Sequence, residues 1–310
     1  MWTKVASVLL ACPCVAPWAL AADTKPAQPA PGRTVEEIKQ KLAEISAAPE
    51  DKEGMPAERA AALRKLKAYR YLAGMPYDDL VLDDSYNRYA EAATQICAKL
   101  GRLDHRPPNP GMPEDEYKLA AKGAASSNLG VGPKNLVSSV DLWMNDSDAG
   151  NIPLLGHRRW CINPYMKKAG FGRTDQYTAM YSFDQSRRNV PDFDFVSYPA
   201  RGLMPVEYFH AGWAWNVSLN PRKYRTPDDA VKPQIYEADE PMKKVGEPLK
   251  LDYEKVNLMP FGIPNCIIFR PEKFTPQPGK RYVVEIDGLK RANGRAAEPI
   301  RFGVEFVSVK

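Results

Sequence analysis

The stretch LKAYRYLAGMP, residues 66–76, marks the end of the first long helix of this 310-residue chain. Gly74 can adopt the left-handed conformation that closes a helix, and Pro76 soon after it cannot continue one. Pro56 suits the first turn of a helix, because its missing amide would have no helical partner there. The sequence therefore predicts a helix from about Pro56 to Gly74.

Helical signals flank this stretch on both sides. Thr34 and Glu37 have the spacing of a capping box, in which each side chain bonds the other residue's backbone amide. Beyond Pro164 the pattern changes to short segments rich in glycine, aromatic residues and threonine, which is typical of strands. Further helices are expected at 34–45, at 84–101 and from Pro133 through Trp143, and strands at 170–172 and 177–183.

The C-terminal third of the chain predicts only strands. Segments of alternating or β-branched residues are separated there by Pro, Gly, Asn and Asp. This spacing favours an antiparallel β-sandwich of immunoglobulin-like build, although no Cys–Trp–Cys pattern accompanies it. We place the junction between the two domains in the Pro-punctuated segment 188–205. The expected strands are 213–219, 231–236, 248–253, 266–269, 282–286 and 300–309.

The N-terminus has the features of an export signal. Lys4 precedes an apolar run, and Ala19-Leu20-Ala21 is a small-x-small cleavage site before Ala22. Residues 1–21 are therefore expected to be a signal peptide and 22–33 a Pro/Ala-rich linker, which predicts a secreted or periplasmic protein. Residues 9–12 allow an alternative, a lipobox that makes Cys12 a lipid-modified N-terminus. No later segment has the apolar length of a membrane span.

The charges and cysteines limit the other function classes. The net charge of +5 is spread along the chain without a basic arm, so nucleic acid is not an expected partner. The pair Arg158-Arg159 is interpreted as solvated surface charge.

The sequence has five cysteines, two of them in the predicted signal peptide. The remaining three, Cys97, Cys161 and Cys266, are an odd number in a compartment that favours disulfides. We therefore expect one disulfide and one unpaired thiol among these three cysteines. The sequence does not fix the pairing, and we take Cys97 and Cys161 as the candidates.

Five segments together resemble the CAP domain (cysteine-rich secretory, antigen and pathogenesis-related proteins), most closely its bacterial type. Residues 66–76 resemble the opening helix, LNxYRxxAGLPP, with Lys67 in the place of Asn. Residues 89–100 with His105 resemble the second helix and its histidine. The resemblance covers about residues 56–185. The remaining matches are residues 140–146, with Trp143, and the pair GHR at 156–158 and GFG at 170–172.

The resemblance implies an α/β/α sandwich CAP domain, which we place at 34–195 with the helix at 34–45 leading it. Together with the β-sandwich that the strand pattern predicts at 196–310, this makes the chain an α+β protein. CAP domains have a shallow cleft with two histidines and two acidic side chains, which in some members hold a divalent cation. The matching positions here are His105, His157 and Asp146, while Ser127 replaces the second acid. Two imidazoles and one carboxylate suit zinc, but the lost carboxylate predicts weak binding.

Three functions remain open at this stage. The first is a secreted, non-enzymatic module whose cleft binds a small apolar or anionic ligand or an extracytoplasmic protein. The second is a metal-dependent hydrolase of peptides or cell-wall material, in which the cation would activate water. The third is a structural envelope protein. We favour the first, because a hydrolase needs a general base and Ser127 stands where the family's acid would be.

Overall fold

The computed structural model describes residues 32–47, 53–240 and 243–310. The predicted signal peptide, the alternative lipid site at Cys12 and most of the linker 22–33 lie outside these ranges. Helix α1 (Val35–Ser46) begins with the predicted capping box. The Glu37 amide donates to Thr34 Oγ1 at 3.1 Å, and the Thr34 amide donates to the Glu37 carboxylate at 2.7 Å.

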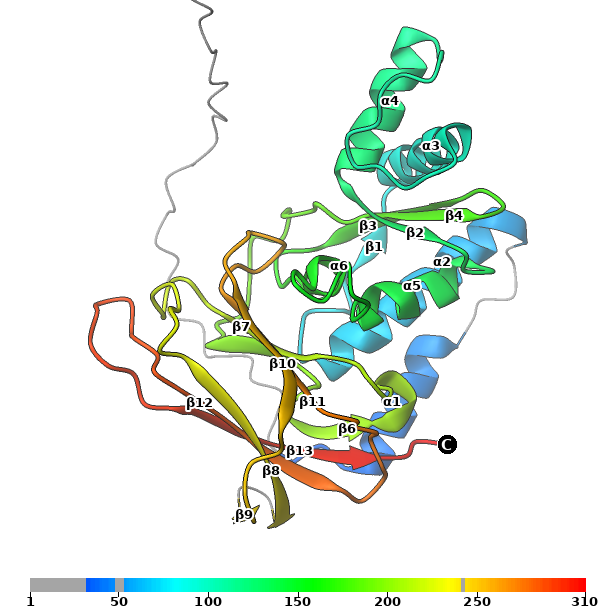
Figure 1. Ribbon diagram of the computed structural model, residues 1–310. Coiled ribbons are helices and arrows are strands. Elements are labelled where there is room, and N and C mark those ends of the chain that lie inside the picture. Colours follow the sequence, from blue (N-terminus) through cyan, green and yellow to red (C-terminus); the bar gives the residue numbers. More distant parts are fainter. Residues whose placement is uncertain (1–31, 48–52, 241–242) are drawn as a thin grey trace, which may run out of the picture.

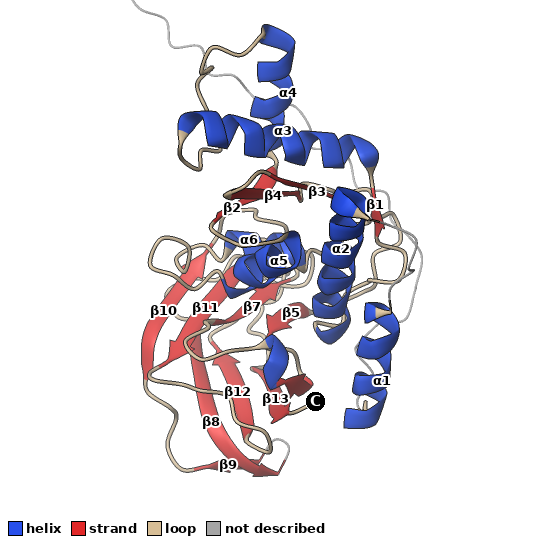
Figure 2. Ribbon diagram, turned by 90° about the vertical axis from the view of Figure 1, so that its right-hand side faces the viewer, coloured by secondary structure: helices blue, strands red, loops and turns tan. Residues whose placement is uncertain are grey.

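The next part of the chain is a three-layer α/β/α sandwich, as expected. A four-stranded sheet of order β1-β3-β4-β2 has α3 and α4 on one face and α2, α5 and α6 on the other (Figures 1 and 2). The helices are α2 (Gly54–Leu72), α3 (Asp84–Leu100), α4 (Glu114–Ala125), α5 (Leu136–Asn145) and α6 (Gly156–Cys161). The strands are β1 (Val81–Leu82), β2 (Ser127–Val131), β3 (Lys168–Arg173) and β4 (Tyr177–Tyr181).

The GFG motif at 170–172 lets α3 lie directly on strand β3. A Cβ atom at Gly170 would stand 2.2 Å from the backbone carbon of Tyr86, and one at Gly172 would stand 2.2 Å from the Glu91 amide nitrogen. Real Cβ atoms do not approach so closely, so neither position admits a side chain without moving the helix. Phe171, between them, points into the core and is fully buried.

The C-terminal part is a sandwich of two sheets. One has the order β10-β11-β7-β5 and the other β6-β13-β12-β8-β9. One feature differs from the prediction: β6 pairs with β13 in parallel, so the sandwich is not wholly antiparallel. The strands are β5 (Phe195–Tyr198), β6 (Gly202–Pro205), β7 (Trp215–Leu219), β8 (Lys232–Glu240), β9 (Lys243–Val245), β10 (Leu251–Asn257), β11 (Cys266–Pro271), β12 (Arg281–Asp287) and β13 (Ile300–Val307), with a short 3-10 helix at Val206–Tyr208.

The two parts share one hydrophobic core. The sandwich packs on the outer side of the α2, α5 and α6 layer (Figure 2), and a single buried cluster contains Tyr69 of α2, Trp143 of α5 and Trp215 of β7. The Tyr69 ring lies 6.1 Å from the Tyr198 ring and 5.2 Å from the Tyr208 ring, measured between centroids. Residues 193–200, within the junction expected at 188–205, are largely buried, so this part of it is not an exposed linker. Strand β5 within it is buried and pairs with β7, so a boundary after residue 195 falls just inside that strand.

The cysteines do not form the expected disulfide. Cys97, Cys161 and Cys266 are all buried and free. Cys97 belongs to the small cluster between α3 and α4, whereas Cys161 belongs to the main core, and this separation keeps the two thiols unpaired. Within the described ranges, no helix combines the length and apolar character needed to cross a bilayer.

Candidate functional site

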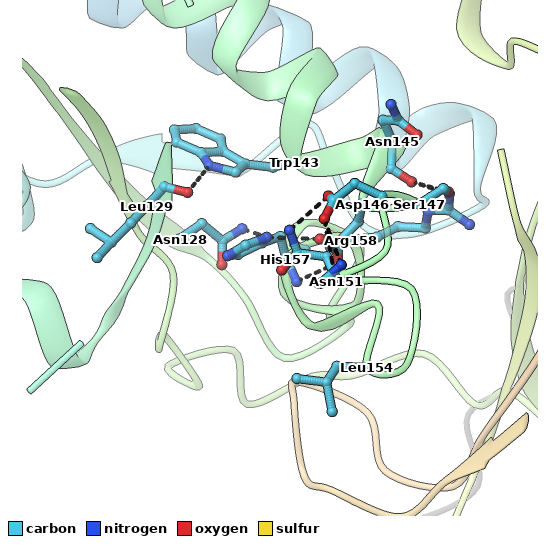
Figure 3. Close-up of polar contacts among 12 residues, drawn as sticks. Asn128, Leu129, Trp143, Asn145, Asp146, Ser147, Asn151, Leu154, His157 and Arg158 are labelled. Atoms are coloured by element: carbon cyan, nitrogen blue, oxygen red, sulfur yellow. Dashed lines mark hydrogen bonds and ion pairs between the residues drawn. The ribbon is translucent and has the colours of Figure 1, made fainter. Parts of the chain in front are cut away.

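The residues selected from the sequence line one cavity of about 800 Å³. His105, Ser127, Asp146 and His157 all contribute to its wall. The cavity lies where the β2 strand, the end of α5 and the start of α6 meet, and Figure 3 shows the polar contacts of this region. The four residues selected from the sequence thus share one cavity, and their geometry decides what the cavity can do.

Asp146 is fixed by the start of helix α6. It ends α5 in the left-handed conformation, with φ of 47°, and its side chain is fully buried. Its Oδ2 accepts hydrogen bonds from the His157 amide at 2.9 Å and from the Arg158 amide at 3.3 Å. Its Oδ1 accepts from His157 Nδ1 at 2.8 Å (Figure 3). Both carboxylate oxygens are therefore occupied by neighbouring donors.

His157 keeps one ring nitrogen open. A carboxylate only accepts, so the bond to Asp146 requires a proton on Nδ1 and leaves Nε2 without a partner among the described residues. Burial lowers the pKa of His157, but the charge and hydrogen bond of Asp146, with a smaller effect of Asp148, more than offset it and raise the pKa above 6.5. The imidazole side chain is 21 % exposed, so it remains accessible from the cavity.

His105 has the same arrangement with a different partner. Its Nδ1 bonds the Ala124 carbonyl at the end of α4 at 2.8 Å, and because a carbonyl only accepts, Nδ1 carries the proton. The Nε2 atom is again the open nitrogen. Each histidine of the cavity is thus held in one tautomer by a fixed acceptor.

Strand β2 supplies the wall between the histidines. Ser127 is 2 % exposed, and its Oγ has no hydrogen-bond partner in the part of the chain that the structure describes. The next residue, Asn128, donates to the His157 carbonyl at 3.0 Å and so ties β2 to α6 (Figure 3). Trp143 of α5 donates to the Leu129 carbonyl at 3.0 Å and holds α5 on the same strand. These buried bonds make the wall rigid.

The donor set does not fit the expected three-ligand zinc site. The Asp146 carboxylate, the proposed anionic ligand, is fully buried in the cavity wall, and both its oxygens already accept hydrogen bonds from His157 and the α6 backbone, so its role is to orient the imidazole. Among the described residues, no three His, Cys, Asp or Glu side chains lie close enough together to hold a metal ion. The other polar side chains that line the cavity are His105, Arg106, Ser127, Asn128, Asp148, Asn151 and His157.

Apolar side chains at the mouth of the cavity were not predicted. Leu103, Val131, Leu142 and Phe183 are each between 38 % and 50 % exposed, and all four line the cavity. We refer to these four residues as the apolar rim. Phe183 also stacks on Trp160 of α6, with 4.2 Å between ring centroids and 23° between planes. Sequence patterns cannot locate such a rim, because they do not separate apolar residues that face water from those in the core.

Arg158 and Arg159 correct the expectation of solvated charge. Both side chains are fully buried. Arg158 donates to backbone carbonyls of the CAP-like part and of the sandwich, including Met144 at 2.7 Å and Ala214 at 2.5 Å. Burial lowers its pKa to about 10, an effect that Asp146 partly offsets, so the guanidinium stays charged at neutral pH. The two arginines therefore fasten α6, and with it His157, to the C-terminal part.

Comparison with known proteins agrees with the resemblance. The model of the cysteine-rich secretory protein family, CAP, matches residues 63–184. No curated protein and no solved structure gives a match. The matched range contains the cavity residues named above and ends before strand β5.

Proposed function

Residues 63–184 form a CAP domain, and from this premise we propose that the chain is an exported, non-enzymatic binding protein whose ligand occupies the cavity beside His157. The ligand has an apolar body and a group that accepts hydrogen bonds, either anionic or neutral. It is a small molecule or the side chain of an extracytoplasmic protein.

The main support for a ligand-binding cavity is the apolar rim. Nine large apolar side chains are exposed among the described residues, and the four of the rim gather around one cavity. Exposed apolar groups gathered around a concavity are typical of a ligand site, because they are covered when the ligand binds. A single exposed residue such as Val245 needs no such explanation.

The polar end of the cavity indicates the second feature of the ligand. The His157 imidazole has a raised pKa, and its open Nε2 becomes a donor when protonated. Arg106, an exposed cation, also lines the cavity. An acceptor group on the ligand would satisfy these donors.

The alternative, a metal-dependent hydrolase of peptides or cell-wall material, is supported less well. It requires a cation with an open coordination position, and the carboxylate expected to hold that cation is bound to His157 and to the α6 backbone. A structural envelope role would leave the clustering of exposed apolar residues at the cavity without a purpose.

Export is part of the proposal and has its own test. The intact mass of protein recovered from the secreting cells should correspond to a chain that begins near Ala22. A mature form that begins at a lipid-modified Cys12 would instead make the protein membrane-anchored.

Binding is tested with anilinonaphthalene sulfonate, a fluorescent probe with an apolar ring system and an anionic group. We expect saturable binding that weakens roughly fivefold in Val131→Asp, because the variant places a carboxylate on the apolar rim. Val245→Asp is the matched control, since Val245 is also exposed but does not line the cavity. Equal affinities in the two variants would contradict the proposal.

A further inference from the structure

One wall of the cavity comes from the C-terminal sandwich. The segment 258–265 joins β10 to β11, and its Phe261 lines the cavity although it lies far outside the matched range 63–184. The ring lies against the start of α6, because a Cβ atom at Gly156 would stand 3.4 Å from it. We call residues 258–263 the sandwich loop.

Arg159 of α6 holds this loop in place. Its Nη2 donates to the Ile263 carbonyl at 2.6 Å and also to the Met259 carbonyl, and its guanidinium carbon lies 5.4 Å from the centre of the Phe261 ring. Gly262, with φ of 63°, lets the loop approach closely: a Cβ atom there would stand 2.6 Å from the Arg159 carbonyl oxygen. The loop backbone is therefore fixed to the helix that carries His157.

A second residue fixes the beginning of the loop. Asn257, at the end of β10, accepts from Arg159 Nη1 at 2.9 Å and donates to the Pro153 carbonyl at 2.9 Å. The segment around Pro153 leads into α6 and also contributes Leu154 to the cavity. The position of Phe261 is thus set before any ligand arrives, which lowers the entropy that binding must overcome.

Aromatic rings from both parts of the molecule line the cavity. Phe183, 43 % exposed and stacked on Trp160, lines the cavity together with Phe261. Aromatic rings pair favourably with other rings in stacked or edge-to-face geometry, beyond the area that they bury. Two rings on fixed supports, one from each part of the molecule, therefore favour a ligand that itself contains a ring.

We propose that the ligand carries an aromatic ring and that the sandwich loop, through Phe261, selects it. The site is then a composite, in which the CAP domain supplies the histidines and the apolar rim and the sandwich supplies part of the specificity. This inference rests on the proposed binding function and names the substrate class for the same cavity.

The test compares two probes with the same anionic head and the same number of carbon atoms, naphthalene sulfonate and decanesulfonate. Their affinities for the full-length mature protein are measured by calorimetry. We expect the wild type to prefer the ring, and Phe261→Leu to weaken naphthalene sulfonate roughly two- to tenfold relative to decanesulfonate. Leucine keeps an apolar side chain on the loop, so a folding defect is not expected. Met259→Leu is the control, because Met259 is on the same loop, 52 % exposed, and does not line the cavity.

The outcomes separate this inference from the function on which it rests. If neither probe binds, the proposed binding function is wrong. If both bind and Phe261→Leu leaves the ratio of the two affinities unchanged, the cavity binds ligands but the sandwich loop does not select them, and the inference is overturned. A change of the same size in Met259→Leu would also overturn it, because the effect would then belong to the loop in general. The source of the ring is tested with N-acetyltyrosinamide, which is expected to compete with naphthalene sulfonate only if an aromatic side chain of a protein is accepted.

Discussion

Replacing Arg158 with methionine should lower the free energy of unfolding by about 3 kcal/mol. The guanidinium is fully buried, and every hydrogen bond that the structure gives it goes to a group that the substitution leaves in place. The four closest acceptors are the carbonyls of Met144, Asn145 and Ala214 and the side-chain oxygen of Asn216, at 2.7, 2.7, 2.5 and 3.0 Å. A fifth, Ser147 Oγ at 3.4 Å, has two other hydrogen-bond partners.

Two opposing effects set the size of this change. Three of the four closest acceptors lose their partner in the variant, since the Asn145 carbonyl also accepts from Ser147 Oγ at 2.6 Å. Each buried acceptor without a partner costs about 1 to 2 kcal/mol, which gives about 3 to 6 kcal/mol for the three. Removal of a buried charge returns part of this, because the guanidinium no longer has to be kept out of water. The cost of the unpaired acceptors should exceed the gain from removing the charge, because the acceptors are mainly backbone carbonyls, which no side-chain change can remove. In a buried salt bridge, by contrast, the carboxylate partner can be replaced together with the arginine, so that no acceptor is left unpaired.

Urea unfolding of the mature protein, followed by tryptophan fluorescence and circular dichroism, measures the effect. Arg188→Met is the matched control, since Arg188 is exposed and the same substitution there should change stability by less than about 0.5 kcal/mol. Arg158→Lys should fall between the two, because an ammonium keeps the charge but cannot reach all four acceptors. A loss below about 1 kcal/mol in Arg158→Met would refute the reasoning, because the acceptors would then be satisfied in another way.

Three further predictions concern the cavity and the junction. The pKa of His157 is raised above 6.5 in the folded protein. Its contribution to stability is therefore complete below pH 6.5 and is lost as the pH rises through the folded-state pKa. The difference in free energy of unfolding between wild type and His157→Gln, measured in urea, should be largest in acid and shrink in alkali. A difference that grows with pH would contradict the Asp146 pairing. Zinc titration by calorimetry at about pH 7.5 should show tighter binding in Ser127→Glu than in wild type, because the variant adds a carboxylate to the cavity that the histidines line. Equal affinities would show that residue 127 does not face the two histidines. Limited proteolysis of the native protein should spare residues 193–200, which are largely buried, and an early cut there would show that the two parts separate readily.

Local signals in the sequence predicted most of the elements. The capping box at Thr34, the stop at Gly74 and the alternation along 300–307 each depend on residues close together in the chain, and each corresponds to an observed element. Helix α4 was missed for a local reason as well. Its buried face consists of the small residues Ala120, Gly123 and Ala124, which give a weak apolar pattern.

Interactions between distant segments could not be predicted. The sequence selected four of the residues that line the cavity, but it could not show that both oxygens of Asp146 accept hydrogen bonds from the start of α6. It likewise could not show that carbonyls from two distant segments, 144–145 and 214, surround Arg158, so the expected solvated charge was wrong. Phe261 carries no motif, and only its place on a loop anchored by Arg159 identifies it.

The helical layer of α2, α5 and α6 is covered on both faces, by the four-stranded sheet and by the sandwich (Figure 2). The CAP domain of this chain is therefore not expected to fold stably without the sandwich. Excised at residue 184, it would expose the apolar surface that Tyr198 and Tyr208 cover on Tyr69, and it would leave Arg158 without its acceptor on Ala214. An isolated fragment should be recovered as aggregate, and grafting this CAP domain onto another protein would require grafting the sandwich with it.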